Sequence, residues 1–186
     1  MRGYPLFLNL KAQHCVVFGG GKVAVRKIQA LLKRGAHVTC VSKDFCQSLK
    51  KVGANLRVRP DRKSGQTHRS APTLKLKYAK NGHVPLYGAR IVIAATSDQD
   101  FNRRVAEACR KKKIWVNVVD DPELCDFYVP AVLERGPLQI AISTGGASPL
   151  FARRLREELE KTIPESTGKL IEKLAKARRK MLGKKK

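Results

Sequence analysis

The chain has 186 residues, of which 42% are hydrophobic; this suffices for one domain with a small appendage and excludes a mostly disordered protein. Its 39 Lys and Arg residues against 15 Asp and Glu residues give a net charge of +24, which indicates a polyanionic partner: nucleic acid, an acidic membrane surface or a carboxylate-rich small molecule. No apolar run reaches the roughly 20 residues of a membrane span, and no secretory signal is evident. The five cysteines form no CxxC pair, so we expect a reducing, cytoplasmic location.

The first part of the chain alternates short apolar runs with amphipathic stretches, which is typical of βαβ units. We expect strands at 14–18, 37–41, 55–58, 89–95 and 114–119. We expect helices at 23–34, from an N-cap at Asp44 to Gly53, and at 98–113. Because the strands are continuous apolar runs, they predict a parallel sheet with helices on both faces, which is a doubly wound α/β fold.

Residues 61–85 interrupt this rhythm with a basic insertion rich in Pro, Gly and Ser. A loop of this length is uncommon unless it is functional or disordered. Two interpretations stay open: a solvated insertion, or a loop that contacts substrate or nucleic acid. A short strand at 74–78 is compatible with both.

The pattern changes after residue 119. Two apolar strands are expected at 127–133 and 138–143, on either side of a turn sequence. Ser148 and Pro149 are typical of a helix start, and this helix should run to about residue 162, followed by a last helix from 166 or 167 to 181. A two-strand ribbon cannot close a core alone, so it must pack on the first domain or on another subunit.

Residues 19–24 read GGGKVA and match the pattern GxGxxA between an expected strand and an expected helix. In this pattern Gly19 makes the tight turn, Gly21 lets the backbone approach a pyrophosphate, and Ala24 permits close packing of helix on strand. The helix N-terminus then stabilises the anion. The motif predicts a dinucleotide site in a Rossmann-like fold; the alternative is a glycine turn that has lost its cofactor.

The end of the second expected strand lacks the usual carboxylate for the adenosine ribose. The residues there are Ser42, Lys43 and Asp44. Asp44 comes one or two positions late and is also suited to cap a helix, whereas Lys43 is suited to a 2′-phosphate. The sequence therefore leaves the choice between NAD and NADP open.

Two further groups of polar residues follow expected strands. Thr96 and Ser97 come after the fourth strand, where ligands bind in this architecture, although a helix cap is the plainer interpretation. Asn117 and Asp120 accompany the fifth strand. Asp120 opens a run, 120–165, in which nine acidic residues outnumber five basic ones, against the trend of the chain. It is placed to act as a general base, or it is simply a turn residue.

A loop rich in hydroxyl groups and glycine precedes the helix that starts at Pro149. Such a loop is a natural anion site and would suit substrate carboxylates, with a plain N-cap loop as the equal alternative. Its candidate residues are Ser143, Thr144, Gly145 and Gly146. The four histidines are isolated and the cysteines lack ligand spacing, so no metal site is predicted.

Taken in order, the glycine motif, the VIAATSD segment, the NVVDDP segment and the ISTGGASP segment resemble precorrin-2 dehydrogenase, the dehydrogenase module of siroheme synthase, over about residues 3–60 and 86–163. The resemblance implies oxidation of precorrin-2 to sirohydrochlorin with NAD, in some members with insertion of ferrous iron. It also implies a homodimer that exchanges the ribbon between subunits. Asp120 matches the family's essential aspartate, and Thr144 matches a position near the substrate pocket.

The resemblance divides the chain into an NAD-binding Rossmann domain at 1–119, a dimerisation ribbon at 120–147 and a C-terminal helical region at 148–186, which is short for the family. From the motif and the resemblance together, the predicted cofactor contacts are Gly19, Gly21, Lys22, Val23, Ala24, Lys43, Asp44, Thr96, Ser97 and Asn117. Two alternatives stay open: an inactive NAD(P)-sensing domain, and a basic nucleic-acid-binding module. The single Trp and the lack of a reader motif argue against the second, and no membrane partner is expected.

Overall fold

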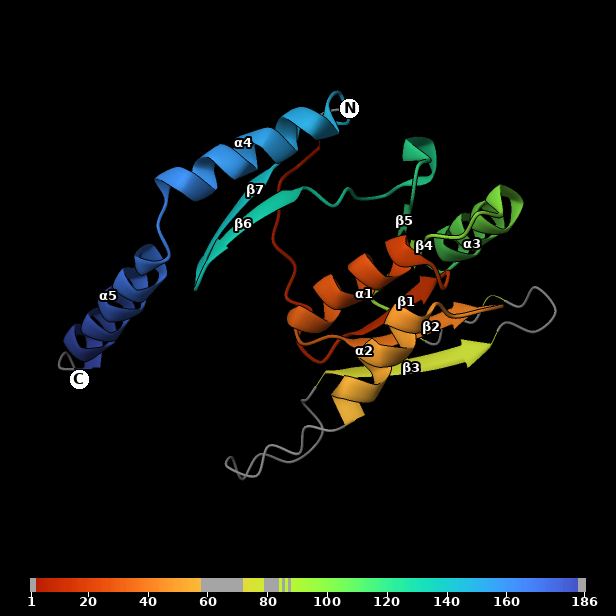
Figure 1. The fold of residues 1–186 in the computed structure, drawn as a ribbon, viewed down its shortest axis with the longest axis horizontal. Coiled ribbons are helices and arrows are strands. Elements are labelled where there is room, and N and C mark those ends of the chain that lie inside the picture. Colours follow the sequence, from red (N-terminus) through yellow and green to blue (C-terminus); the bar gives the residue numbers. More distant parts are fainter. Residues whose placement is uncertain (1–2, 58–71, 79–83, 85, 87, 184–186) are drawn as a thin grey trace. The chain divides into compact units, whose positions relative to one another are not determined.

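The computed structural model describes residues 3–57, 72–78, 84, 86 and 88–183 (Figure 1). The chain divides into two compact units. We call Pro5–Tyr128 the sheet unit, and Val129–Lys186 together with Met1–Tyr4 the ribbon unit. The sheet unit extends past the predicted boundary at 119. Most of the predicted insertion at 61–85 lies outside the described residues. Within the described residues, no helix is long and apolar enough to cross a membrane.

In the sheet unit, the part of the chain that the structure describes forms five parallel strands in the order β3-β2-β1-β4-β5. They are β1 (His14–Phe18), β2 (His37–Ser42), β3 (Thr73–Tyr78), β4 (Ile91–Ala94) and β5 (Trp115–Val118). The chain moves outward from β1 to β3 and then returns to the other side of β1 to add β4 and β5. Ligands bind at such a switch point, beside the carboxyl ends of the strands. The predicted doubly wound α/β fold is thus confirmed.

Helices cover both faces of this sheet (Figure 1). They are α1 (Lys22–Lys33), α2 (Gln47–Arg57) and α3 (Gln99–Lys111). Alternate residues of β1 belong to different cores: Val17 packs in the cluster that contains α1 and α2, and Phe18 packs in the cluster that contains α3. Both side chains are fully buried. This explains why the strand is apolar at every position rather than at every second one.

The predicted strand at 55–58 is wrong over its described residues, because α2 continues through Gly53 to Arg57. The third strand is instead β3, within the segment for which a short strand was considered. A Cβ on Gly53 would lie 3.9 Å from side-chain carbons of both Leu74 and Leu76. This glycine therefore marks the close contact between α2 and β3, and does not end the helix.

The described residues of the ribbon unit form two antiparallel strands and two helices. They are β6 (Ala131–Arg135), β7 (Leu138–Ile142), α4 (Pro149–Thr162) and α5 (Ser166–Gly183). The predicted strand at 127–133 starts later than expected, directly after Pro130, which has no N–H to donate to a ladder. Ser148 caps α4 as predicted, because its Oγ accepts the Phe151 N–H at 3.2 Å.

Arg135 organises the ribbon unit. Its guanidinium donates to the carbonyl oxygens of Ile163 at 2.8 Å and Glu160 at 3.0 Å, which lie at the end of α4. It also pairs with Glu165 at 3.0 Å. The carbonyl of Arg135 packs against Gly168, where a Cβ would lie 2.7 Å from the oxygen. One residue of β6 therefore holds both the end of α4 and the start of α5.

Candidate functional site

The glycine turn after β1 lies between the ends of β2 and β4. Gly19 has a φ of +116°, which side-chain-bearing residues rarely adopt. Its N–H donates to Val41 O at 2.9 Å. On the other side, a Cβ on Gly19 would overlap the carbonyl oxygen of Ala95 and lie 2.8 Å from its carbon. Only glycine fits this position, as the motif predicts.

The next two glycines differ in what surrounds them. A Cβ on Gly20 would overlap Asp44 O and lie 2.8 Å from Ser42 Oγ, so this residue is held against the end of β2. The GxGxxA motif assigns no role to Gly20. The run of three glycines was the only feature of the sequence that could have indicated this constraint. By contrast, the described residues place nothing within 4 Å of a Cβ on Gly21. Gly21 therefore leaves open space beside the backbone.

Gly21 is also the N-cap of α1, and no side chain in the described part of the chain caps this helix. The first backbone N–H groups of a helix have no partner within it, and they carry the positive end of the helix dipole. The first turn of α1 holds no acidic residue. The start of α1 is therefore suited to an anion such as a pyrophosphate.

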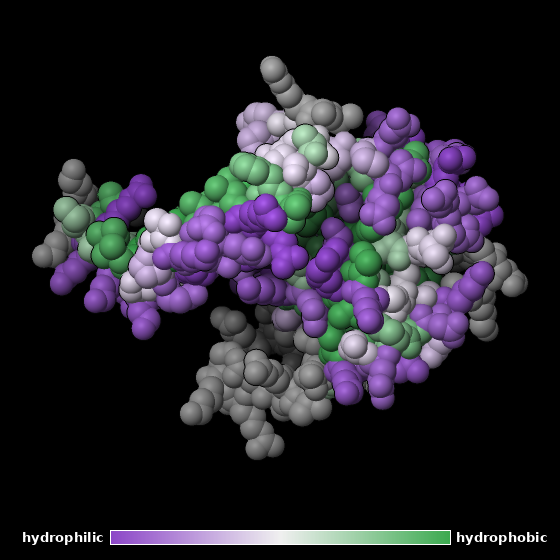
Figure 2. All heavy atoms as spheres, turned by 45° about the horizontal axis from the view of Figure 1, so that its top comes forward, coloured by the Kyte–Doolittle hydropathy of each residue, from purple (hydrophilic) through white to green (hydrophobic). Residues whose placement is uncertain are grey.

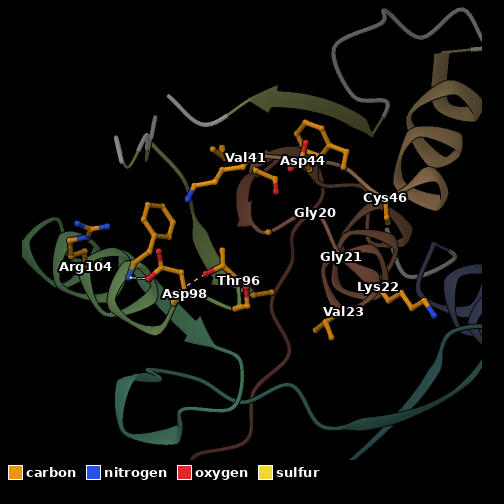
Figure 3. A pocket seen from close by; sticks show the side chains of 17 residues that line it. Gly20, Gly21, Lys22, Val23, Val41, Asp44, Cys46, Thr96, Asp98 and Arg104 are labelled. Carbon is orange, nitrogen blue, oxygen red and sulfur yellow. Dashed lines mark hydrogen bonds between the residues drawn. The ribbon is translucent and has the colours of Figure 1, made fainter. Parts of the chain in front are cut away.

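A cavity of about 870 Å³ opens at this edge of the sheet (Figure 3). Most of the predicted cofactor contacts line it, namely Gly19, Gly21, Lys22, Val23, Lys43, Asp44, Thr96 and Ser97. Ala24 is buried in the core and Asn117 belongs to β5; neither lines the cavity. The volume lies within the usual range of roughly 300–1,000 Å³ for ligand sites.

Several lining residues were not predicted. Phe45 and Cys46 follow β2, and Phe101 and Arg104 lie on α3. The ring of Phe101 meets Phe18 edge-on at 5.6 Å, and the Arg104 guanidinium lies 5.6 Å from the centre of the Phe101 ring. Phe101 and Arg104 are three residues apart in the sequence, which places them on one face of the helix and could have linked them.

The loop after β4 is held by its own polar groups. Thr96 Oγ1 donates to Asn102 Oδ1 at 2.6 Å, and Asn102 Nδ2 donates back to Thr96 O at 3.0 Å. Asp98 caps α3, because its Oδ1 accepts the Phe101 N–H at 2.8 Å. Asn102 is buried, so this small network fixes the wall of the cavity. Both the Thr96 hydroxyl and the Asp98 carboxylate are thereby engaged within the protein.

Asp120 follows β5 at the same edge of the sheet. The N–H of the preceding residue, Val119, donates to Ala94 O of β4 at 2.9 Å, which places Asp120 beside the ends of both strands. Asp120 is exposed and has a φ of +63°. Asp and Asn adopt this left-handed conformation more readily than most residues, and strained backbone often marks functional positions.

The residues around Asp120 hold the segment that follows it. Asn117 is buried, and its Nδ2 donates to Phe127 O at 2.9 Å and to Cys125 Sγ at 3.4 Å. Asp126 Oδ2 accepts the Val116 N–H at 2.9 Å. Asp126, which also belongs to the acidic run that begins at Asp120, is thus committed to holding the chain against β5. Asn117 contributes its amide to the same task.

Lys27, on α1, interacts electrostatically with this region. Burial lowers the pKa of its ammonium group, and the charge of Arg26 lowers it further. The charges of Cys125 and Asp120 act in the opposite direction. The half-buried ammonium group of Lys27 therefore interacts electrostatically with the candidate base, Asp120.

The predicted substrate loop belongs to the ribbon unit. Ser143 Oγ accepts the Gly145 N–H at 3.2 Å, and Thr144 Oγ1 accepts the Ser148 N–H at 3.0 Å. Gly145 and Gly146 both have positive φ values, of 64° and 90°. The loop therefore uses its hydroxyl oxygens as acceptors, while a hydroxyl can still donate its own proton.

The described residues contain no group of three or more His, Cys, Asp or Glu side chains that could hold a metal ion. The five cysteines are free thiols. Burial raises the pKa of Cys15 to about 11 and, together with the charge of Cys46, that of Cys40 to about 12. Cys40 lies near the cavity but donates its S–H to Gly19 O at 3.2 Å, which supports the glycine turn.

Comparison with known proteins places the chain among related sequences. A family model described as "Putative NAD(P)-binding" matches residues 6–131, and one described as "Sirohaem biosynthesis protein central" matches residues 135–162. Similar curated proteins include a siroheme synthase of Thioalkalivibrio sulfidiphilus, 42% identical over 169 residues (90% of this chain, 31% of the relative), and one of Nitrosospira multiformis, 40% identical over 170 residues (91% of this chain, 34% of the relative).

Among solved structures, SirC, a precorrin-2 dehydrogenase, matches with a TM-score of 0.70 and 29% identity over 95% of this chain and 79% of the other. The chain spans about a third of the length of the curated relatives that it matches. The match to SirC covers 79% of that protein, so SirC is closer to this chain in length than these two siroheme synthases are.

Proposed function

The chain belongs to the NAD(P)-binding family whose model covers residues 6–131, and from this premise we propose that it is an NAD-dependent dehydrogenase that oxidises precorrin-2 to sirohydrochlorin. One observation carries the proposal. The glycine turn, its cavity and Asp120 all lie at the carboxyl edge of one sheet, with Asp120 one strand beyond the cavity wall formed after β4. The similarity to siroheme synthases and to SirC supports the same activity.

The residues at the glycine turn fit a dinucleotide. Gly21 leaves open space beside the uncapped start of α1, and the cavity continues from there past Lys43 and Asp44 on one side and Thr96 and Ser97 on the other. In this fit the N–H groups at the start of α1 hold the pyrophosphate, and the residues after β2 border the adenosine. When bound, NAD supplies the hydride acceptor.

Asp120 is our candidate for the catalytic base. The oxidation removes two electrons and two hydrogens from the substrate, and the carboxylate takes the hydrogen that leaves as a proton. Three features support this role: Asp120 is exposed, it lies at the end of β5, and its backbone is held in a left-handed conformation. We assign Asn117 a supporting role, because its amide holds the following segment in place.

We propose that the loop at 143–146 contacts the carboxylates of the substrate. The Ser143 and Thr144 hydroxyls each accept a backbone N–H within the loop, and each can still donate its own proton to a carboxylate. The high positive charge of the chain, +24, favours the approach of a substrate that carries several carboxylates.

We propose further that the protein is a homodimer formed through the ribbon unit. Large apolar side chains of α4 and α5 are exposed, and Figure 2 shows hydrophobic residues among hydrophilic ones on this part of the surface. The most exposed are Leu150, Phe151, Leu170, Leu174, Met181 and Leu182. A two-strand ribbon with helices has too little core to cover these faces by itself. Light scattering of the purified protein tests the dimer.

Turnover tests the proposed activity. Purified protein is incubated with NAD and precorrin-2, and sirohydrochlorin formation is followed by absorbance. Asp120→Asn should lower kcat by roughly 10²-fold or more, because positioned proton transfer contributes about 10²–10⁴-fold. Asn tolerates the same backbone conformation, so the fold should be retained. Asp121→Asn, which removes the neighbouring carboxylate, is the matched control and should remain active.

Each result has a clear meaning. If Asp120→Asn is fully active, the base assignment is wrong. If the wild-type protein binds NAD but turns over no precorrin-2, the protein is a sensing domain and not a dehydrogenase. A parallel reaction with sirohydrochlorin and ferrous ion tests chelation as a separate activity.

A further inference from the structure

A hydroxyl and a cation stand directly at the end of β2, where an NAD-specific site places a carboxylate, and the carboxylate of Asp44 comes only two residues beyond that end. In a Rossmann-like site, an acidic residue at the end of the second strand hydrogen-bonds the adenosine ribose of NAD, whereas a nearby Arg accommodates the 2′-phosphate of NADP. Here β2 ends at Ser42, and Lys43 follows. Ser42 is fixed close to the glycine turn, since a Cβ on Gly20 would lie 2.8 Å from its Oγ.

A second cation reaches the cavity from the other side of the turn. Arg104 lies on α3, after β4, and lines the cavity with Lys43. Its guanidinium is held over the ring of Phe101, which itself rests edge-on against the buried Phe18. In Figure 3, Arg104 lies on the side of the cavity away from Lys22, which begins α1 where the pyrophosphate would bind.

The carboxylates that line the cavity do not cancel these cations. Asp98 is engaged as the cap of α3, accepting the Phe101 N–H at 2.8 Å. Asp44 is exposed and lies two residues beyond the end of β2. Among the described residues, the cavity is thus lined by three cationic side chains, Lys22, Lys43 and Arg104, and by two carboxylates, of which Asp98 is committed. A dianionic phosphate group on the ribose would find charge of the opposite sign here.

We infer that this cavity accepts a 2′-phosphorylated adenosine, so that the protein takes NADP as well as NAD, with Lys43 and Arg104 as the residues that determine this tolerance. The inference rests on the proposed function in one respect only, which is that the cavity is the dinucleotide site. It concerns the selectivity of that site and is independent of the substrate that is oxidised.

Binding of the two reduced cofactors tests the inference. NADH and NADPH are titrated against the full-length protein, and their fluorescence gives two dissociation constants. These should agree within about tenfold. Lys43→Ala and Arg104→Ala each remove a charged hydrogen-bond donor to the 2′-phosphate, which NADH lacks. Each variant should therefore lower the ratio of NADPH affinity to NADH affinity about tenfold. The matched control is Arg103→Ala, which removes an exposed cation of α3 outside the cavity lining and should leave the ratio unchanged.

A half-cofactor isolates the adenosine end. Adenosine 2′,5′-bisphosphate should displace NADPH at lower concentration than ADP, which has no 2′-phosphate, and raised salt should reduce this advantage because it screens the exposed cations. If NADH binds but NADPH binds more than about 100-fold more weakly, or if the ratio is the same in both cavity variants as in the wild type, the inference is overturned and the proposed function stands. If neither cofactor binds, both fail.

Discussion

Substitution by alanine should affect different properties of the protein at Gly19 and at Gly21. Gly19→Ala places a methyl group against the backbone of Ala95 at a φ of +116°, whereas Gly21→Ala places one in open space. Gly21 has an extended backbone, with φ −88° and ψ −175°, which alanine adopts without strain. The first change should therefore damage folding, and the second should damage cofactor binding.

The magnitudes follow from the local geometry. For Gly19→Ala, the left-handed backbone costs about 1–3 kcal/mol and the overlap with a backbone carbonyl costs about as much again, giving roughly 2–6 kcal/mol. In a chain of this size this corresponds to a fall in Tm of roughly 5–20 °C. For Gly21→Ala, the loss of a good N-cap costs only about 0.5–1 kcal/mol. The methyl group at the pyrophosphate position should weaken NAD binding at least about tenfold.

The chain offers a convenient probe for this experiment. Its single tryptophan, Trp115, begins β5, so tryptophan fluorescence during urea or thermal unfolding reports on the sheet unit. NAD affinity is measured in parallel by calorimetry. Gly183→Ala serves as the control, because a Cβ there also meets nothing within 4 Å but lies at the end of α5.

Two results would refute the reasoning. If Gly19→Ala unfolds at the wild-type temperature, the close contact between the turn and Ala95 is wrong. If Gly21→Ala binds NAD as tightly as the wild type, the open space beside α1 is not where the pyrophosphate lies.

Three further predictions concern stability. Asn117→Ala leaves Phe127 O without its amide donor and should cost about 1–3 kcal/mol in the urea unfolding of the sheet unit; an unchanged unfolding midpoint would contradict the role of this amide. Because burial raises the pKa of Cys40 from 9.0 to about 12, the unfolded chain loses this proton first as the pH rises above about 9, so the free energy of unfolding should fall there by up to about 1.4 kcal/mol per pH unit. Cys40→Ala should show a shallower fall, and an identical pH profile would count against it. Gly168→Ala brings a methyl group to 2.7 Å from Arg135 O and should accelerate hydrogen exchange along α5, at a cost of about 1–3 kcal/mol; unchanged exchange would show that the contact can relax.

Local sequence patterns predicted most of the sheet unit. Four of the five predicted strands in this part of the chain match β1, β2, β4 and β5, because a buried parallel strand is an uninterrupted apolar run that needs no partner to be recognised. The prediction of a strand at 55–58 was wrong because the local pattern there was ambiguous. Its residues suit a strand and a helix alike, and only the packing of α2 on Leu74 and Leu76 decides between them.

The candidate site divides in the same way. The glycine turn and the residues after β2 and β4 could be named from the sequence, because a turn between strand and helix requires glycine wherever it occurs. The spacing of Phe101 and Arg104 places them on one face of α3, but only the packing of α3 against β1 brings that face to the cavity. The hydrogen bond from the Asn117 amide to Phe127 O likewise depends on the path of the chain after Asp121.

By itself, then, the amino-acid sequence determined a doubly wound sheet, a glycine turn at its switch point and a carboxylate after its last strand, because each is a property of contiguous residues. The tertiary structure alone decided which strand lies at the β3 edge, that Gly20 is as constrained as Gly19, and that Arg104 shares the cavity with Lys43. These features arise from contacts between segments far apart in the chain. Such contacts leave no periodic trace in the sequence, and here they set the charge and shape of the site.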